Sequence, residues 1–317
     1  MPVSDAALFP APPRRASGCT SKSKTAIVLA HFGTTAPSGL KSVTAISEAV
    51  RRAYPDAETR VTFTSNIVRA VWRGRRAEAR KWLDQGVPKE ILAVKNIIQT
   101  LGDLSEDGYR DIIVQPSHIA YMEECRDLEN YVRAIGSIET TQAKWRPFNR
   151  VVLGRPAFGG PGNQHDCHED VVRAAATLAP DVAAAAAMGA ALLYMGHGNK
   201  NQSSGIYAMT EKIMRERYPH TKVHISVIEG RPSLDEAIAA MKEEGVNKVY
   251  LKPFLVTAGG HANNDMAGDG KDSWLSVLTG HGFTVWPVLS GLGENPEFAR
   301  IFVEHIGDAA ASQGIAL

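Results

Sequence analysis

The sequence has little cysteine, no long apolar run and almost no net charge. Its 317 residues include three scattered cysteines, Cys19, Cys125 and Cys167, which argues against a disulfide framework and favours a reducing compartment. The formal net charge of +1 gives no global reason to expect nucleic acid or an anionic membrane as a partner. The alanine-rich stretch 182–193 is too short to span a bilayer. These absences favour a globular protein of the cytoplasm.

The first 23 residues differ from the rest of the chain. Residues 1–23 are rich in Pro, Ser and Ala and have no helical or strand periodicity, so we expect a disordered tail. Arg14 and Arg15 resemble the basic residues of a processed signal sequence, but the apolar segment that such a sequence requires is missing. We therefore expect no export.

The remaining chain contains one pattern twice. A strand-like run opens each copy, at 25–33 and at 191–198, and strands then alternate with helices in the approximate order β-α-β-α-β-β-α. Such alternation predicts parallel sheets with right-handed crossovers. We therefore expect an α/β fold of two similar doubly wound parallel-sheet domains, 24–180 and 181–317, which face a central cleft. The terminal helices are expected to pack across the domain boundary.

Three side chains of the types that commonly bind metals follow strand-like runs in the second copy. They are His197, Glu229 and His261, and they are evenly spaced, 32 residues apart. If the strands are parallel neighbours, all three groups emerge at the carboxyl edge of one sheet, where ligands bind in open α/β folds. Two imidazoles and a carboxylate suit a divalent ion such as Co²⁺, Fe²⁺, Ni²⁺ or Zn²⁺.

The first copy serves as an internal comparison. His31 takes the place of His197, Ser65 or Asn66 that of Glu229, and the segment Gln115–His118 that of the loop before His261. Only the second copy has the full set of two histidines and a glutamate. The scaffold itself does not require these ligands, so we expect the second half to carry the chemistry.

Several longer motifs resemble those of a known family. They span about residues 25 to 305 and are AHFGTT, FTSNIVR, QPSHI, YMGHG, the Glu-Gly pair at 229–230, GGHANNDMAGDGKDSW and LSGLGENP. The chain resembles the sirohydrochlorin cobaltochelatases of anaerobic cobalamin biosynthesis, which are two-domain relatives of ferrochelatase. Two departures stand out, because many relatives carry Ser where His31 stands, and residues 1–23 have no counterpart.

The resemblance implies an activity and a metal site. It implies insertion of Co²⁺ into sirohydrochlorin (or precorrin-2) with loss of two pyrrole protons. It also implies that His197, Glu229 and His261 hold the metal before insertion. We expect one of the two histidines to accept a pyrrole proton, and Glu229 to offset the charge of the metal and either accept the second proton or orient a histidine. No organic cofactor is expected.

Other residues are candidates for contact with the substrate, which is rich in carboxylates. Arg69, Arg73 and Arg76 recur at helical spacing and predict either a carboxylate-binding face or a solvated one. His31 and His118 follow apolar strands of the first half and either face the cleft or form hydrogen bonds within the domain. Strand ends add three weaker candidates, which are Arg155, Lys200 and Arg231.

The glycine-rich loop 259–274 contains three aspartates of interest. Asp265 and Asp269 could support a metal ligand or attract a cation. For Asp272 we prefer a role as N-cap of the helix that follows.

Alternative functions remain open at the level of the sequence. The same ligands would hold Fe²⁺ for insertion into sirohydrochlorin, and a non-enzymatic two-lobed protein could carry a metal or haem. A dinucleotide-binding enzyme is set aside, because no GxGxxG follows the first strand. The sequence does not determine the oligomeric state, and a homo-oligomer is left open.

Overall fold

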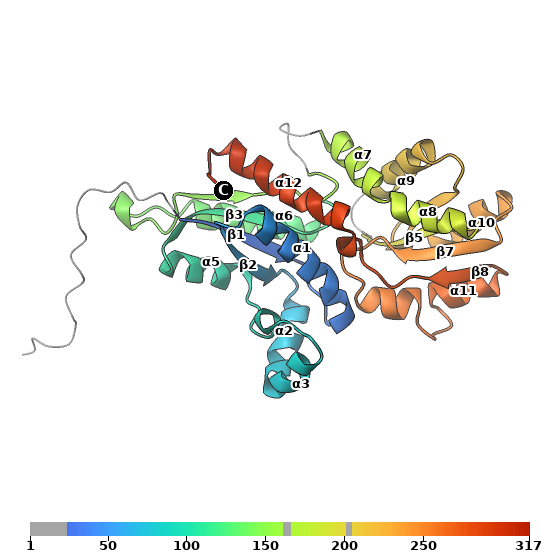
Figure 1. Ribbon diagram of the computed structural model, residues 1–317, viewed down its shortest axis with the longest axis horizontal. Coiled ribbons are helices and arrows are strands. Elements are labelled where there is room, and N and C mark those ends of the chain that lie inside the picture. The colour runs from blue at the N-terminus through green and yellow to red at the C-terminus, as the bar shows by residue number, and fades with distance from the viewer. Residues whose placement is uncertain (1–23, 161–165, 201–204) are drawn as a thin grey trace, which may run out of the picture.

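The computed structural model describes residues 24–160, 166–200 and 205–317. The tail predicted for residues 1–23 lies outside the described residues. Two sheets form the core of two lobes (Figure 1), and both are parallel with four strands in the same relative order, β2-β1-β3-β4 and β6-β5-β7-β8. The shared order confirms the predicted repeat, and the predicted α/β fold class is correct.

The described residues form eight strands, and in each sheet the first and third strands along the chain are the central ones. The first sheet contains β1 (Lys24–His31), β2 (Glu58–Phe63), β3 (Tyr109–Pro116) and β4 (Arg150–Leu153). The second sheet contains β5 (Ala191–Gly198), β6 (Val223–Glu229), β7 (Lys248–Pro253) and β8 (Thr284–Pro287).

Helices connect the strands and cover both faces of each sheet. In the first half they are α1 (Leu40–Ala53), α2 (Asn66–Arg75), α3 (Ala79–Asp84), α4 (Lys89–Leu92), α5 (Ile97–Glu106) and α6 (Glu123–Gly136). They continue with α7 (Cys167–Thr177), α8 (Ala179–Ala187), α9 (Gly205–Arg217), α10 (Leu234–Glu243), α11 (Trp274–Gly280) and α12 (Pro296–Ser312). Single turns are η1 (Pro37–Gly39), η2 (Arg76–Glu78), η3 (Ala143–Trp145), η4 (His261–Met266) and η5 (Leu292–Glu294).

The central strands are apolar because helices cover both of their faces. In β1, every residue from Ala26 to His31 is buried, and in β5 every residue except His197 is buried. Burial of this kind contributes about 25 cal/mol per Å² of apolar surface, so these strands stabilise the fold.

One part of the predicted element order is wrong. Strands three and four of each half do not follow one another directly, because α6 lies between β3 and β4, and α11 between β7 and β8. A parallel pair requires a crossover connection, and these helices supply it.

The terminal helix of each half lies against the other half. Helix α12 packs against α1, β3 and β4 of the first half (Figure 1). The hydroxyl of Tyr54 at the end of α1 donates to the carbonyl of Val303 in α12 at 2.9 Å. Helix α7, which lies before β5 in the chain, packs against α9 of the second half. The domain boundary near residue 180 remains a prediction.

Arg155, which follows β4, forms ion pairs with both α7 and α12. Its guanidinium donates to Asp170 of α7 at 2.7 and 3.1 Å and pairs with Asp308 of α12 at 2.8 Å. The fully buried His305 lies 3.4 Å from the Asp170 carboxylate. Burial raises the pKa of Asp170, but the contacts with His305 and Arg155 outweigh it and lower that pKa from 3.8 to about 2. This ionic cluster fastens the two halves together.

No helix of the described ranges is both long and apolar enough to cross a membrane.

Replacing Asp170 by Asn tests the ionic cluster. We expect the free energy of unfolding to fall by roughly 3 kcal/mol at pH 7, because Arg155 loses a buried partner. Asp308→Asn serves as the control, since Asp308 is more exposed, and we expect a loss of about 1 kcal/mol or less. Urea denaturation measures both, and an unchanged stability of Asp170→Asn would refute the role of the cluster.

The same variant should alter the dependence of stability on pH. The lowered pKa of Asp170 means that its contribution is complete above about pH 4 and is lost as the pH falls towards 2, because the unfolded chain takes up the proton first. Asn cannot ionise. The difference in stability between the natural protein and Asp170→Asn should therefore shrink between pH 4 and 2.

Candidate metal and substrate site

His197 is the one exposed residue of β5 and lies at its carboxyl end. The Nδ1 atom of its ring lies 2.9 Å from the carbonyl oxygen of Gly198. A carbonyl only accepts, so Nδ1 carries the proton and Nε2 keeps a free electron pair in the neutral ring. Gly198 has φ +74°, and a Cβ there would lie 2.0 Å from the carbonyl oxygen of Glu229. Only glycine allows β5 to end this close to β6.

Glu229 ends β6, the strand next to β5, and pairs with Gly198 in the register of the two strands. Its half-buried carboxylate lies 3.7 Å from the ammonium group of Lys200. Glu229 is therefore beside the end of β5, as the sequence predicted, but its charge is balanced by a lysine in this structure.

His261 begins the π-helical turn η4, which follows β7. Its Nδ1 atom lies 2.6 Å from the carboxylate of Asp265, one turn further along. Because an ionised carboxylate only accepts, Nδ1 again carries the proton and Nε2 remains available to a ligand. Single π-helical turns of this kind are frequent at functional sites.

The structure brings the two histidines together. Their ring centroids are 4.9 Å apart and the rings are nearly perpendicular, although 64 positions of sequence separate them. Glu229 does not join them, and across the described ranges no group of three His, Cys, Asp or Glu side chains is arranged to hold a metal ion. Two of the predicted ligands are thus adjacent, whereas Glu229, the third, is paired with Lys200.

A second polar cluster lies at the carboxyl edge of the first sheet. His31 is 1% exposed, and its Nδ1 lies 2.5 Å from the hydroxyl of Ser117. The ring of His118 lies 3.4 Å from the hydroxyl of Thr64. Burial, together with His118, lowers the pKa of His31 to about 3, and burial lowers that of His118 to about 4. Both rings are neutral at pH 7 and are weak proton acceptors.

The first-half arginines do not share one role. The guanidinium of Arg69 donates to the carbonyls of Phe63 and Thr64, so it fastens α2 to the end of β2. Arg76 donates to the carbonyl of Leu92 at 2.5 Å. Arg73 remains exposed on α2 and is the better candidate for a substrate carboxylate.

Arg155 and Arg231, the weaker candidates, are paired within the protein. Arg155 is enclosed by Asp170 and Asp308, and Arg231 lies 3.4 Å from Glu236.

The predicted cap at Asp272 is wrong. The side chain of the next residue, Ser273, accepts from the backbone N–H of Ser276 and caps α11. Asp and Ser are both favoured at this position, and the backbone path decides between them.

Comparison with known proteins identifies the family. The model of the cobalt chelatase (CbiK) family matches residues 25–311. The chain belongs to the cobalt chelatase family. The predicted resemblance and the predicted enzyme class, a metal chelatase, are thereby confirmed.

Two curated relatives cover almost the whole chelatase. One is the sirohydrochlorin cobaltochelatase CbiKC of Nitratidesulfovibrio vulgaris, 30% identical over 289 residues, which are 91% of this chain and 92% of the relative. The other is the sirohydrochlorin cobaltochelatase of Salmonella typhimurium, 28% identical over 288 residues, 90% of this chain and 96% of the relative.

Solved structures of low sequence identity share the fold. SirB from Bacillus subtilis with Fe³⁺ has a TM-score of 0.59 at 14% identity, over 92% of this chain and 98% of that one. The sirohydrochlorin chelatase SirB from Bacillus subtilis subspecies spizizenii, in complex with cobalt, has a TM-score of 0.55 at 14% identity, over 92% and 97%. They support the two-domain chelatase fold.

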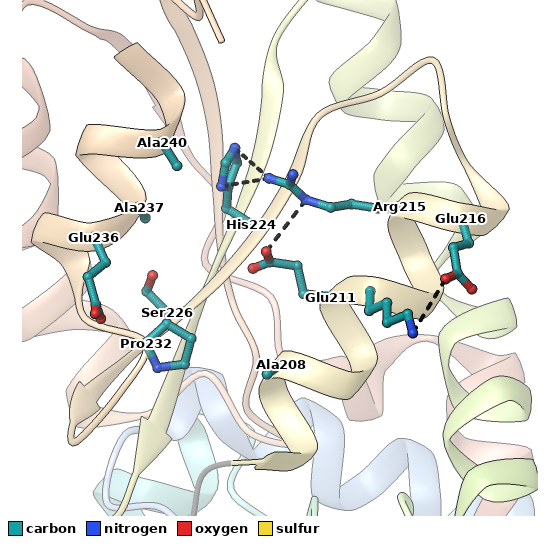
Figure 2. A pocket seen from close by; sticks show the side chains of 11 residues that line it. Ala208, Glu211, Arg215, Glu216, His224, Ser226, Pro232, Glu236, Ala237 and Ala240 are labelled. Atoms are coloured by element: carbon teal, nitrogen blue, oxygen red, sulfur yellow. Dashed lines mark hydrogen bonds and ion pairs between the residues drawn. The ribbon is translucent and has the colours of Figure 1, made fainter. Parts of the chain in front are cut away.

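A cavity of about 560 Å³ in the chelatase lies elsewhere, between α9 and α10 against β6 (Figure 2). Its lining includes none of the predicted site residues. Arg215 donates to the carbonyl of Val223, and Glu211 accepts from the N–H of Ile225, both at 2.7 Å. These side chains satisfy the free edge of β6, so we assign the cavity no part in catalysis. The cleft expected between the halves remains a prediction.

Replacing Asp265 by Ala tests the orientation of His261. We expect the affinity for Co²⁺ to fall about tenfold or more, because the ring loses the partner that fixes its tautomer. Asp269→Ala removes the same charge from the same exposed loop and should change the affinity by less than about threefold. Calorimetric titration with Co²⁺ compares the two, and equal effects would show that only net charge matters.

Proposed function

We propose that this cobalt chelatase inserts Co²⁺ into sirohydrochlorin, with loss of two pyrrole protons, in anaerobic cobalamin biosynthesis. Membership of the cobalt chelatase family and the names of the two curated relatives support the metal and the substrate. The observation that carries the proposal is the adjacent pair His197 and His261, whose Nδ1 atoms are both engaged as donors. Both Nε2 atoms are thereby left as metal ligands.

The metal would be held by His197, Glu229 and His261. The ammonium group of Lys200 lies near Glu229 in this structure, and a divalent cation would replace it as the partner of the carboxylate. Three protein ligands leave positions for water and then for the pyrrole nitrogens. Glu229 would offset one of the two positive charges of the ion, which lowers the cost of bringing it to the edge of the sheet.

Insertion exchanges one set of bonds for another. Two pyrrole nitrogens lose their protons and form bonds to Co²⁺, while the bonds from Co²⁺ to the protein break. As the metal leaves, an Nε2 atom of His197 or His261 regains a free electron pair and can accept one proton as a general base. Glu229 or solvent would receive the other.

The substrate must also be positioned. Arg73 is exposed on α2 and suits a carboxylate of sirohydrochlorin, and bidentate contacts of this kind are strong. His31 and His118 remain candidates for contact with the macrocycle. Because His31 is buried in this structure, direct contact would require its exposure.

Three further predictions concern the setting of the enzyme. The two-histidine, one-carboxylate set does not separate Co²⁺ from Fe²⁺ by affinity alone, so insertion of iron remains the alternative activity. A cytoplasmic location and assembly into a homo-oligomer likewise remain predictions.

An anaerobic turnover assay tests the proposal. Purified protein, sirohydrochlorin and Co²⁺ should give multiple turnovers, followed by the absorbance change on metal insertion. His197→Ala, Glu229→Ala and His261→Ala should each lower kcat/KM at least about a hundredfold, the loss expected when a group that acts directly in the reaction is removed. The same assay with Fe²⁺ measures the preference for metal.

The outcomes distinguish the functions. A stoichiometric spectral change without release would indicate a carrier rather than an enzyme. Near-normal turnover in all three variants would refute the metal site.

A further inference from the structure

The loop that carries His261 rests on the first half of the protein. Thr34 follows β1 and is 4% exposed. A Cβ placed on Gly259 of the second half would lie 2.8 Å from the hydroxyl oxygen of Thr34. That separation is shorter than real Cβ contacts, so the backbone at Gly259 touches the Thr34 side chain directly.

Thr34 cannot easily move away from this contact. Its hydroxyl accepts from the N–H of Ala36 at 3.1 Å, and its carbonyl accepts from the indole of Trp72 at 2.8 Å. On its other side, a Cβ on Gly39 would meet the hydroxyl and the methyl group of Thr34 at 3.0 and 3.1 Å. The β-branched side chain thus contacts two glycines, and its branching at Cβ restricts rotation about χ1.

Gly259 is linked in turn to the first turn of η4. Its carbonyl accepts from the backbone N–H of Asn263 at 3.1 Å and from the side-chain amide of Asn263 at 2.8 Å. His261 lies between these two residues. A displacement of Gly259 would therefore shift the backbone from which the His261 ring projects towards His197.

We propose that Thr34 is a positioning residue for the metal site, acting through Gly259 to set the place of His261. This inference rests on the proposed metal site at His197, Glu229 and His261. The first half of the protein, which lacks the full ligand set, thereby contributes to the affinity of the second half for metal. Small shifts suffice, because metal–nitrogen bonds of about 2.1 Å tolerate little error.

A pair of neighbouring glycines provides a matched test. Gly259→Ala introduces a methyl group against Thr34. Gly260→Ala introduces the same group one residue closer to His261, where the nearest atom is 4.0 Å away and the backbone is helical, with φ −55°. The dissociation constant for Co²⁺, measured by anaerobic calorimetric titration, should rise about tenfold or more in Gly259→Ala and change less than about twofold in Gly260→Ala.

A double variant separates positioning from general damage. Thr34→Ala removes the hydroxyl, and the next atom of residue 34 is then its Cβ at 3.5 Å, so the Gly259 methyl group fits. The dissociation constant of the double variant Thr34→Ala, Gly259→Ala for Co²⁺ should lie within about threefold of that of Thr34→Ala alone. The reason is that the added methyl group no longer meets the hydroxyl. The rescue should be seen in metal affinity, whether or not Gly259→Ala also lowers the melting temperature or yields little folded protein.

Two controls keep the proposals apart. If the natural protein does not bind Co²⁺, or if His261→Ala binds it as tightly as the natural protein, the proposed metal site is wrong. If His261→Ala loses affinity but Gly259→Ala does not, or if the double variant is as impaired as Gly259→Ala, Thr34 does not position His261.

Discussion

The close approach of the His197 and His261 rings depends on one geometric constraint, that parallel strands of one sheet end at the same edge. Strands β5 and β7 are neighbours, so the end of β5 and the loop after β7 meet although they are distant in the chain. Gly198 lets β5 end against the backbone of Glu229, so the third predicted ligand lies beside the end of β5. The hydrogen bonds at both Nδ1 atoms leave Nε2 of each ring as the nitrogen available to a ligand. The proposed metal site depends on both the sheet and these orienting contacts.

The two halves share an architecture and differ in what their sheet edges can do. At the first edge, burial lowers the pKa of His31 and of His118, whereas the side chains of His197 and His261 at the second edge are exposed. The two halves are nevertheless packed together, because α12 and α7 each contact the other half and Arg155 forms ion pairs with both helices. This packing supports the proposal that Thr34 of the first half positions the loop that carries His261. In the proposed site, one copy of the repeat provides support and the other provides the ligands.

Sequence alone predicts those features that depend on local pattern. Buried strands appear as apolar runs, and the even spacing of His197, Glu229 and His261 follows from three successive strand–helix units. Helix α6 escaped prediction because charged residues dominate its exposed faces, although Cys125, Leu128 and Val132 repeat at helical spacing and could have revealed it. The partners of Arg155 and of Glu229 could not be predicted. They depend on tertiary packing and on side-chain rotamers that no local pattern encodes. The Thr34–Gly259 contact is of the same kind.

A crystal structure of the protein grown anaerobically with Co²⁺ tests the central claim most directly. The account predicts one ion at the carboxyl edge of the second sheet, bound by Nε2 of His197, Nε2 of His261 and the carboxylate of Glu229. Lys200 should then have turned away from that carboxylate. An ion bound elsewhere, for example between His31 and His118, would contradict the account. So would an ion held by the two histidines while Glu229 remains paired with Lys200.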